Sequence, residues 1–553
     1  MEKFSIKHMK CDVLVVGGGG GGIRAALVAA DAGMNVILAS ETKISGSGST
    51  FYPFSHEWGM LYATDQQDAQ QFQNEILTAS GECLNKALAD KLARDSTRAY
   101  EQLVREGVPF VPMRDVGITG CFGRQPRGAF LDDMRELTQA WERELGKRKN
   151  IRIETGQTIV SLVSDRMRCY GAVAVDRDGN LTSIRAAAVV LACGGGEGLY
   201  EYGAAYGKLY GSAYAMAARY GVRLVNLEFI QFVHGSVSPK KGINYYLFSY
   251  REIPAFYNGK GETCLKQYLP AGMSEEECIL AHAAHGPFST DSKGKYLEYA
   301  MVGEYRKGNG LGLTVVPDAD RVKGNRYRLW ERFLNRFGMN AATPMTLYSF
   351  AQGFNGGILL HEDIHTDMEG LFACGESAGG CHGPNRMGGL CVLATQVFGE
   401  AAGKAAVSYA EKRPDEQLSD AAVEERLRME FADGAAETET APENVMRCIR
   451  STMQQYACLH RNEEGLARAL EEIEKLKIYP LSHLCNGRTT MYFDAYNAID
   501  AARLILTSMR QRKESRGCHD RSDYPMRDEK QTKMNWVTMD NGLVLGGTLE
   551  TEP

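Results

Sequence analysis

The sequence predicts an α/β fold with a doubly wound parallel sheet, an inserted α+β capping domain and a C-terminal helical domain. Residues 11–33 read as a buried strand, a run of glycines and a small-residue helix, and a second buried strand follows at 34–40. Two more strands that end in glycine occur at 189–196 and 370–380. This β-α-β start, with later strands of the same kind, is typical of a nucleotide-binding sheet covered by helices.

Length and composition exclude several classes of protein. The 553 residues suit a chain of several domains, and a formal net charge of -6 offers no broad basic surface for nucleic acid. No apolar run approaches the roughly 20 residues of a membrane-spanning helix. The N-terminus lacks the pattern of a signal peptide, so we expect a cytoplasmic protein, held at the inner membrane face only through partners.

The 14 cysteines are scattered, without any C-x-x-C pair. This spacing is typical of reduced thiols in a cytoplasmic protein. Iron–sulfur clusters need grouped thiolates, so we expect no cluster bound by this chain. The sequence predicts no metal site.

The other elements follow in chain order. Residues 66–106 are predicted to be helical, and residues 151–195 are predicted as strands with a hairpin turn at DRDGN. Residues 210–221 suggest a helix and 222–232 a strand; 397–411 suggest a helix, and 418–513 a mainly helical region. We therefore expect a discontinuous nucleotide-binding domain, a cap, a helical domain and a polar C-terminal tail extended over the surface, with these bounds: 1–235 and 355–412, 236–354, 413–515, and 516–553.

The glycine run at 17–22 contains the spacing G-x-G-x-x-G at Gly17, Gly19 and Gly22. The first glycine permits the tight turn, the second permits close approach to a pyrophosphate, and the third permits close packing of helix on strand. The other three glycines are interpreted as permissive. A flexible linker is the alternative, but linkers are not flanked by a buried strand and helix.

The nucleotide can be NAD or FAD on this motif alone. Ser40 and Glu41 end the second strand, where a side chain can bind ribose hydroxyls, although Glu41 equally suits a surface role. The two additional strand-and-glycine segments favour the longer FAD molecule. In the second of them, Gly375 and Glu376 follow a buried strand, and Glu376 can accept hydrogen bonds from FAD, or else serve as a helix N-terminal acid.

The segment GLFACGESAGGCHGPNRMGGLCVLATQVFGEAAG resembles the flavoprotein subunits of succinate dehydrogenase and fumarate reductase, to which L-aspartate oxidase and the adenylylsulfate reductase flavoprotein are similar. VVGGGGGGIRAA, LACGGG, LEFIQF and RKESRGCHDRSDYPMRDE carry the same resemblance. It implies an FAD-dependent oxidoreductase with the Rossmann-type FAD-binding domain, the cap and the helical domain. It implies FAD binding through these residues and the turn at 390–393: Gly17, Gly19, Gly22, Ser49, Thr50, Gly194, Glu376, Cys391 and Val392.

The resemblance also implies that Arg386 grips a substrate carboxylate over the flavin, a task that suits a planar guanidinium. Pairing with Glu376 is the structural alternative. Four departures change the expected chemistry: Ser49 stands where covalent members have the flavin-linked histidine, Val233 precedes a displaced His234, Gln352 replaces a substrate histidine, and Ala283 takes the place of the proton-delivering arginine. We therefore expect non-covalent FAD and a substrate other than fumarate or succinate. Leu390 and Cys391 replace a further family pair.

Flavin enzymes exchange hydride with a substrate carbon while the protein supplies orientation and a proton. The candidate catalytic residues are His382, which shares a turn with Arg386, then His234 and His285; Tyr296 and Arg251 are weaker candidates. Each histidine also has an ordinary packed or surface role as an alternative. We expect hydride transfer to or from a small organic acid, of enoate type, with electrons exchanged through an iron–sulfur, ferredoxin-like partner. Adenylylsulfate reductase-like and L-aspartate oxidase-like enzymes, and a non-catalytic electron-transfer subunit, stay open as alternatives.

Overall fold

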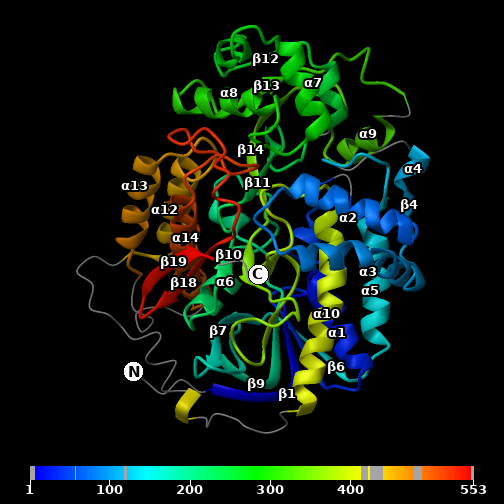
Figure 1. The fold of residues 1–553 in the computed structure, drawn as a ribbon, viewed down its shortest axis with the longest axis vertical. Coiled ribbons are helices and arrows are strands. Elements are labelled where there is room, and N and C mark those ends of the chain that lie inside the picture. The colour runs from blue at the N-terminus through cyan, green and yellow to red at the C-terminus, as the bar shows by residue number, and fades with distance from the viewer. Residues whose placement is uncertain are drawn as a thin grey trace.

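The computed structural model describes residues 6–55, 58–116, 121–131, 133–245, 247–324, 327–412, 421–423, 440–478 and 489–549. Figure 1 shows the nucleotide-binding sheet and its helices forming the lower body, with the cap above and the helical region at one side. The predicted class, an α/β protein with a capping domain and a helical C-terminal domain, is confirmed.

The main sheet has seven strands in the order β6-β2-β1-β9-β8-β7, with β16 beside β9. Strands β1, β2, β6, β9 and β16 pair in parallel, whereas β7 and β8 form an antiparallel extension. DRDGN turns between β8 and β9, as predicted. The strands are β1 (Ile6–Val16), β2 (Val36–Ser40), β6 (Ile151–Thr155), β7 (Thr158–Ser164), β8 (Cys169–Val175), β9 (Leu181–Leu191) and β16 (Leu371–Ala373).

Two helices pack backbone to backbone beside this sheet, as the neighbouring blue and yellow helices of Figure 1 show: α1 (Gly20–Asp31) and α10 (Leu390–Lys412). A Cβ on Gly399 would lie 2.7 Å from the carbonyl oxygen of Gly21, and one on Gly403 would lie 2.9 Å from that of Ala25. Only glycine therefore permits this spacing. Helix α10 starts at Leu390, so residues 390–393, predicted as a turn, are the first turn of a helix.

Helix α10 is also the one helix in the described ranges that is long and apolar enough to cross a membrane, judged by length and composition. Of its most apolar 18-residue window, 67% is buried inside the protein. Its composition is explained by packing against α1 and the sheet.

The remaining helices of the first half, α2 to α6, cover the sheet and a small three-stranded sheet, β3-β5-β4. The helical prediction for residues 66–106 is confirmed, and the structure divides this stretch into two helices, α2 and α3. Their bounds are α2 (Gln66–Ser80), α3 (Lys86–Arg105), α4 (Met113–Val116), α5 (Met134–Gly146), α6 (Ser212–Ala218), β3 (Trp58–Met60), β4 (Val111–Pro112) and β5 (Ala129–Leu131).

The cap is built on a four-stranded antiparallel sheet, β11-β14-β13-β12, and helices α7 and α8 lie on either side of its upper end in Figure 1. The strand predicted over 222–232 is divided: β10 (Leu224–Val225) and β11 (Ile230–Ser238) belong to different sheets, because Asn226 turns the chain with a φ of 58°. The other members are β12 (Phe256–Tyr257), α7 (Glu275–His285), α8 (Lys295–Arg306), β13 (Leu313–Val315), α9 (Arg328–Asn335) and β14 (Met345–Phe354).

Helices α12 (Pro442–Tyr456), α13 (Glu463–Glu474) and α14 (Thr489–Gln511) form the helical region; most of 413–439 lies outside the described residues. The C-terminal hairpin β18 (Asn535–Asp540) and β19 (Leu543–Thr548) joins β10 in the sheet β17-β15-β10-β18-β19. In that sheet β15 is Gly357–Leu359 and β17 is Ala378–Gly379.

The prediction that residues 516–553 extend over the surface is wrong for much of the described part. Arg516, His519 and Arg521 are fully or almost fully buried. Arg512 donates to the Glu228 carboxylate at 2.5 Å and to Glu514 at 3.0 Å, and all three side chains are completely buried. A chain of polar residues is buried here because its charges pair with one another and with backbone carbonyls.

Gly22 gives the first testable prediction. A Cβ at this position would lie 1.9 Å from the carbonyl oxygen of Gly17, a contact that the strand-to-helix turn cannot accommodate without moving. Gly22→Ala should therefore lower the FAD content of the purified protein and destabilise it by about 1–3 kcal/mol. Gly146→Ala is the matched control, because a Cβ there meets nothing within 4 Å. Equal FAD content and melting temperature in both variants would contradict the packing role of Gly22.

Candidate functional site

One cavity of about 700 Å³ extends from the glycine run of the first sheet to the cap. Its size falls within the roughly 300–1,000 Å³ of small-molecule sites. Its lining includes most of the predicted cofactor and catalytic residues: Gly17, Gly19, Ser40, Glu41, Ser49, Thr50, Gly194, Gly375, Glu376, Cys391, Val392, Arg386, His382 and His234.

The glycine turn forms one end of this cavity. Gly17 has a φ of 114°, and a Cβ on it would lie 2.2 Å from the carbonyl oxygen of Ala192, so the turn requires glycine. A Cβ on Gly19 would meet nothing nearer than Thr50 Oγ1 at 3.8 Å, and would occupy the space in front of the helix N-terminus. The Thr50 hydroxyl accepts from the backbone N–H of Gly20 at 3.2 Å. Gly22 does not line the cavity. Its role is to allow the start of α1 to pack closely against the carbonyl of Gly17.

The interpretation of the intervening glycines as merely permissive needs correction. Helix α1 already includes Gly20 and Gly21. A Cβ on Gly21 would lie 3.1 Å from the backbone nitrogen of Gly375 and 3.2 Å from Cys374 Sγ. The strand β16 and the start of α1 therefore approach each other closely at Gly21.

Ser40 and Glu41 lie at the end of β2, at the side of the cavity where the ribose is expected. Glu41 forms an ion pair with Lys208 at 2.7 Å, and the same ammonium group contacts Asp494 of α14 at 2.8 Å. Burial raises the pKa of Asp494 to about 6, with Lys208 opposing the shift. Glu41 therefore has an ion-pair partner, Lys208, and it also lines the cavity.

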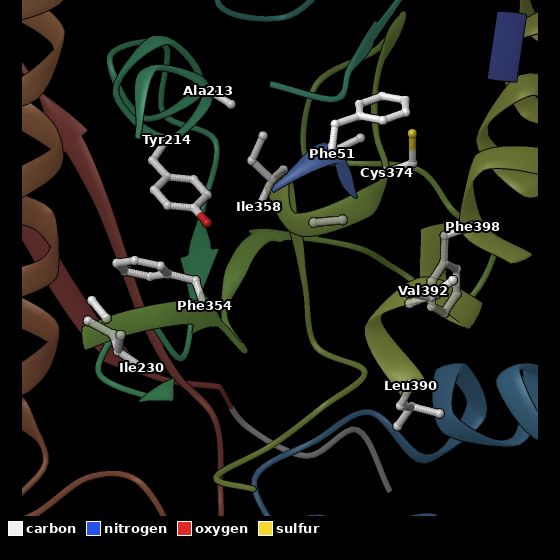
Figure 2. Packing of buried hydrophobic residues seen from close by; sticks show 14 of the residues in the cluster. Phe51, Ala213, Tyr214, Ile230, Phe354, Ile358, Cys374, Leu390, Val392 and Phe398 are labelled. Atoms are coloured by element: carbon white, nitrogen blue, oxygen red, sulfur yellow. The ribbon is translucent and has the colours of Figure 1, made fainter. Parts of the chain in front are cut away.

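Glu376 lines the cavity. Its carboxylate accepts from the Ser49 hydroxyl at 3.0 Å and from the backbone N–H of Phe354 at 2.9 Å. The hydroxyl of Tyr214 donates to the Glu376 carbonyl at 2.9 Å, and Figure 2 shows Tyr214 beside Phe354 in the cluster of buried hydrophobic residues. Glu376 stands in a three-residue 3-10 turn, Gly375–Ser377.

Glu197 lies next to Glu376 and is completely buried. Burial, and then the neighbouring Glu376 carboxylate, raise the pKa of Glu197 well above its ordinary value. Both oxygens of Glu197 lack a hydrogen-bond partner among the described residues. The sequence reasoning missed this residue, because only the fold brings the segment after 194 next to 376.

These residues fit an FAD molecule. The N-termini of α1 and α10 both open into the cavity, Thr50 supplies a hydroxyl and Glu376 a carboxylate, and the Gly17–Gly19 turn leaves space that side chains would fill. Helix N-termini stabilise negatively charged groups such as a pyrophosphate.

Arg386 is 5% exposed and lines the cavity. Its Nη2 donates to Gln352 Oε1 at 3.3 Å, and its Nη1 donates to the carbonyl of Met387 at 3.5 Å. It forms no ion pair with Glu376 or with another carboxylate of the described residues. A buried guanidinium without a counter-ion is costly, and a bound anion would offset that cost.

The turn that carries Arg386 is held from two sides. The Gln231 side chain donates to the Arg386 carbonyl at 3.0 Å, and the backbone N–H of Cys518 donates to the Pro384 carbonyl at 3.0 Å. A Cβ on Gly517 would lie 2.5 Å from that same carbonyl. The C-terminal segment therefore supports the arginine turn directly.

His382 lies on the same turn, 6% exposed, and its Nδ1 has no hydrogen-bond partner within the described ranges. Burial, and then the charge of Arg386, lower the pKa of His382 to about 3. The imidazole is therefore neutral near pH 7 when no anion is bound.

His234 lies on β11 at the cap side of the cavity, in a buried cluster. Its Nδ1 is 2.5 Å from the Tyr250 hydroxyl, its Nε2 is 3.3 Å from Glu298 Oε1, and its ring stacks on His282 with centroids 4.2 Å apart. His282 Nδ1 lies 3.4 Å from the same Glu298 oxygen. Burial lowers the pKa of His234 to about 4. Tyr250, His282 and Glu298 were not predicted, because they come from separate segments of the cap.

The weaker candidates fall in different places. Arg251 is exposed and lines the cavity, and Ala283, next to His282 on α7, also lines it. Tyr296 does not line it and packs on Tyr299. His285 ends α7, but its side chain lies outside the described residues.

Comparison with known proteins supports an FAD-binding protein. The model of an FAD binding domain matches residues 12–248, and that of the fumarate reductase flavoprotein C-terminus matches residues 446–544. The chain is 29% identical over 542 residues to an uncharacterised FAD-dependent oxidoreductase of Methanocaldococcus jannaschii, covering 96% of this chain and 95% of that one. It is 25% identical to a subunit of the CoM/CoB fumarate reductase of Methanothermobacter marburgensis, covering 95% and 96%. L-aspartate oxidases are further relatives.

Among solved structures, Sdh1 of Mycobacterium smegmatis superposes with a TM-score of 0.82 at 24% identity, over 98% of this chain and 94% of that chain. This likeness shows the fold. The two matching family models together span more than half of the sequence. The chain belongs to the fumarate reductase and succinate dehydrogenase flavoprotein family, and it is an FAD-dependent oxidoreductase, as the resemblance implied.

Proposed function

We propose that the protein transfers hydride between FAD and a small organic acid of enoate type, other than fumarate. The observation that carries the proposal is Arg386, a buried guanidinium that faces the cavity without a carboxylate partner among the described residues. A planar guanidinium binds a carboxylate with two parallel hydrogen bonds, which also fixes the orientation of the acid. Gln352, in the place of a substrate histidine, orients Arg386 and leaves a site different from that for fumarate.

FAD, when bound, supplies hydride exchange at its N5 atom. Arg386 holds the substrate carboxylate and withdraws electron density from the double bond conjugated with it. His382 is the residue placed to deliver or receive the proton, since it lies on the same turn. When a carboxylate neutralises Arg386, the charge that lowers the pKa of His382 is offset, and the imidazole becomes a stronger base. Binding of the acid thus prepares the proton step.

A non-covalent FAD is part of the proposal. Ser49 stands where a linking histidine would be, and its hydroxyl is engaged with Glu376. Acid precipitation of the purified protein should therefore leave the yellow flavin in the supernatant, measured by absorbance near the flavin maximum. Flavin that stays with the pellet after washing in denaturant would contradict the proposal.

Electrons come from an iron–sulfur partner in this proposal. The described residues contain no cysteine cluster and no disulfide, and one relative is itself named as a subunit, so an assembly of subunits is supported. The buried side chains of Glu514 and Arg516 are not available to contact that partner.

The test reduces the purified, FAD-loaded protein under anaerobic conditions and follows reoxidation of the flavin. The panel contains enoates, fumarate, adenylylsulfate, imino acids and a ferredoxin-like iron–sulfur protein. We expect rapid reoxidation by an enoate, and none by the methyl ester of the same acid, which cannot bind Arg386 as an anion. Reoxidation by the iron–sulfur protein alone would instead indicate an electron-transfer subunit, and a response only to adenylylsulfate or imino acids would indicate the corresponding relatives.

A further inference from the structure

The buried cluster of His234, His282 and Glu298 in the cap is not explained by the hydride-transfer proposal. The three side chains come from β11, α7 and α8, and each is at most 3% exposed. Within the part of the chain that the structure describes, both carboxylate oxygens of Glu298 and the Nε2 atom of His234 make no hydrogen bond of ordinary geometry, although Nε2 and Glu298 Oε1 approach to 3.3 Å. Buried polar atoms without such hydrogen bonds call for a ligand or an ion.

His234 also contacts Tyr250, and this contact bears on which nitrogen of the imidazole carries the proton. The 2.5 Å contact between His234 Nδ1 and the Tyr250 oxygen is compatible with either tautomer of the imidazole; in the tautomer whose Nδ1–H donates to Tyr250, the Nε2 lone pair of a neutral His234 faces the carboxylate of Glu298. His282 Nδ1 approaches the same carboxylate oxygen. Lone pairs that converge in this way repel one another unless a cation lies between them.

The cation can be a proton or a metal ion, and the distances favour the metal. Charge-assisted hydrogen bonds between nitrogen and carboxylate are about 2.7–2.9 Å long. The two distances to Glu298 Oε1 are longer, 3.3 and 3.4 Å. Ligands placed about 2.0–2.1 Å from Zn²⁺ in a tetrahedral arrangement are separated by roughly 3.3–3.4 Å. The potential ligand atoms all lie within 4.8 Å of one another.

We propose that His234, His282 and Glu298 form a binding site for one divalent transition-metal ion, of which Zn²⁺ is the representative. Two imidazoles and one carboxylate are a common ligand set for such ions, with a fourth position left open. Tyr250 acts as the outer partner that fixes the tautomer and orientation of His234. Because His234 and His282 line the cavity whereas Glu298 does not, the open position faces the cavity. An oxygen of water or of a bound acid can complete the coordination.

The experiment uses the full, FAD-loaded chain. After treatment with a chelator and dialysis against Zn²⁺ or Co²⁺, metal content is measured by mass spectrometry, and Co²⁺ binding is followed by its visible d–d absorption. We expect one ion per wild-type chain. His282→Ala and Glu298→Gln should weaken binding by at least about 100-fold, and Tyr250→Phe by about 10–100-fold, the usual cost of losing an outer-shell partner.

Flavin content and melting temperature are recorded for every variant, so that loss of metal can be separated from loss of the fold. His361→Ala is the matched control, because His361 is a half-exposed histidine paired with Asp367 at 2.9 Å, distant from the cluster in sequence. A wild-type chain that retains neither Zn²⁺ nor Co²⁺ would overturn the proposal and leave a shared proton as the cation. Binding that is unchanged in both ligand variants would also overturn it. Neither result depends on whether enoates are the substrates.

Discussion

Arg386→Ala should retain FAD and lose most of its activity. Truncating one partner of a buried charge pair costs about 2–5 kcal/mol, so kcat/KM for the acid should fall by about 30- to 5,000-fold. kcat/KM falls because the substrate carboxylate loses its two oriented hydrogen bonds to Arg386 while it still has to enter a buried cavity. Anaerobic stopped-flow reoxidation of the reduced protein, at several concentrations of the acid, measures both kcat and KM.

Arg386→Lys tests whether geometry matters beyond charge. A lysine keeps the positive charge but loses the planar pair of donors, so an intermediate loss is expected. FAD content, measured by absorbance, should be unchanged in both variants, since the cofactor contacts lie elsewhere in the cavity. Full turnover in Arg386→Ala with full FAD content would remove Arg386 from the substrate site.

Arg512→Met should produce the largest loss of stability. Glu228 and Glu514 are completely buried and both pair with Arg512, while Glu514 also pairs with Arg516 at 2.8 Å. Removing Arg512 therefore leaves the Glu228 carboxylate in a low-dielectric environment without its cationic partner, at a cost of about 3–5 kcal/mol. The free energy of unfolding, from urea denaturation followed by circular dichroism, measures the effect.

Arg468→Met is the matched control for this prediction. Arg468 also pairs with a carboxylate, that of Glu472 at 3.0 Å, but its side chain is 66% exposed. Exposed pairs contribute little, so no measurable change is expected. Equal shifts of the urea midpoint in the two variants would contradict this prediction. They would mean that burial of the Arg512 ion pairs does not cause the loss of stability.

Local features of the sequence predicted much of the fold. The strand, glycine turn and helix at 11–33 lie within one short stretch, and their order alone specifies a parallel β-α-β unit. The motif around Arg386 could likewise be recognised in the sequence, because the histidine, the arginine and the glycines of this motif share one turn. The cavity accordingly contains most of the predicted residues.

The features of the fold and the site that were not predicted depend on contacts between segments that are distant in the sequence. Glu298 meets His234 across 64 positions, and no spacing within either segment indicates that α8 will bring Glu298 next to β11. The division of 222–232 into two strands was missed for a similar reason, since apolar residues continue through a turn that only the two sheets require. The C-terminal tail looked like a surface segment because its residues are charged, yet the charges neutralise one another in the interior.

The buried pairing of Glu228 with Arg512 has a consequence for synthesis of the chain. Domains generally fold in order as they leave the ribosome. Glu228 emerges early, whereas Arg512 and the residues that support the arginine turn are translated some 280 residues later. Until Arg512 has been translated, the Glu228 carboxylate lacks its cationic partner, and this part of the interior cannot be completed. A nascent chain of this protein should therefore remain sensitive to proteases until residues 512–521 have been released.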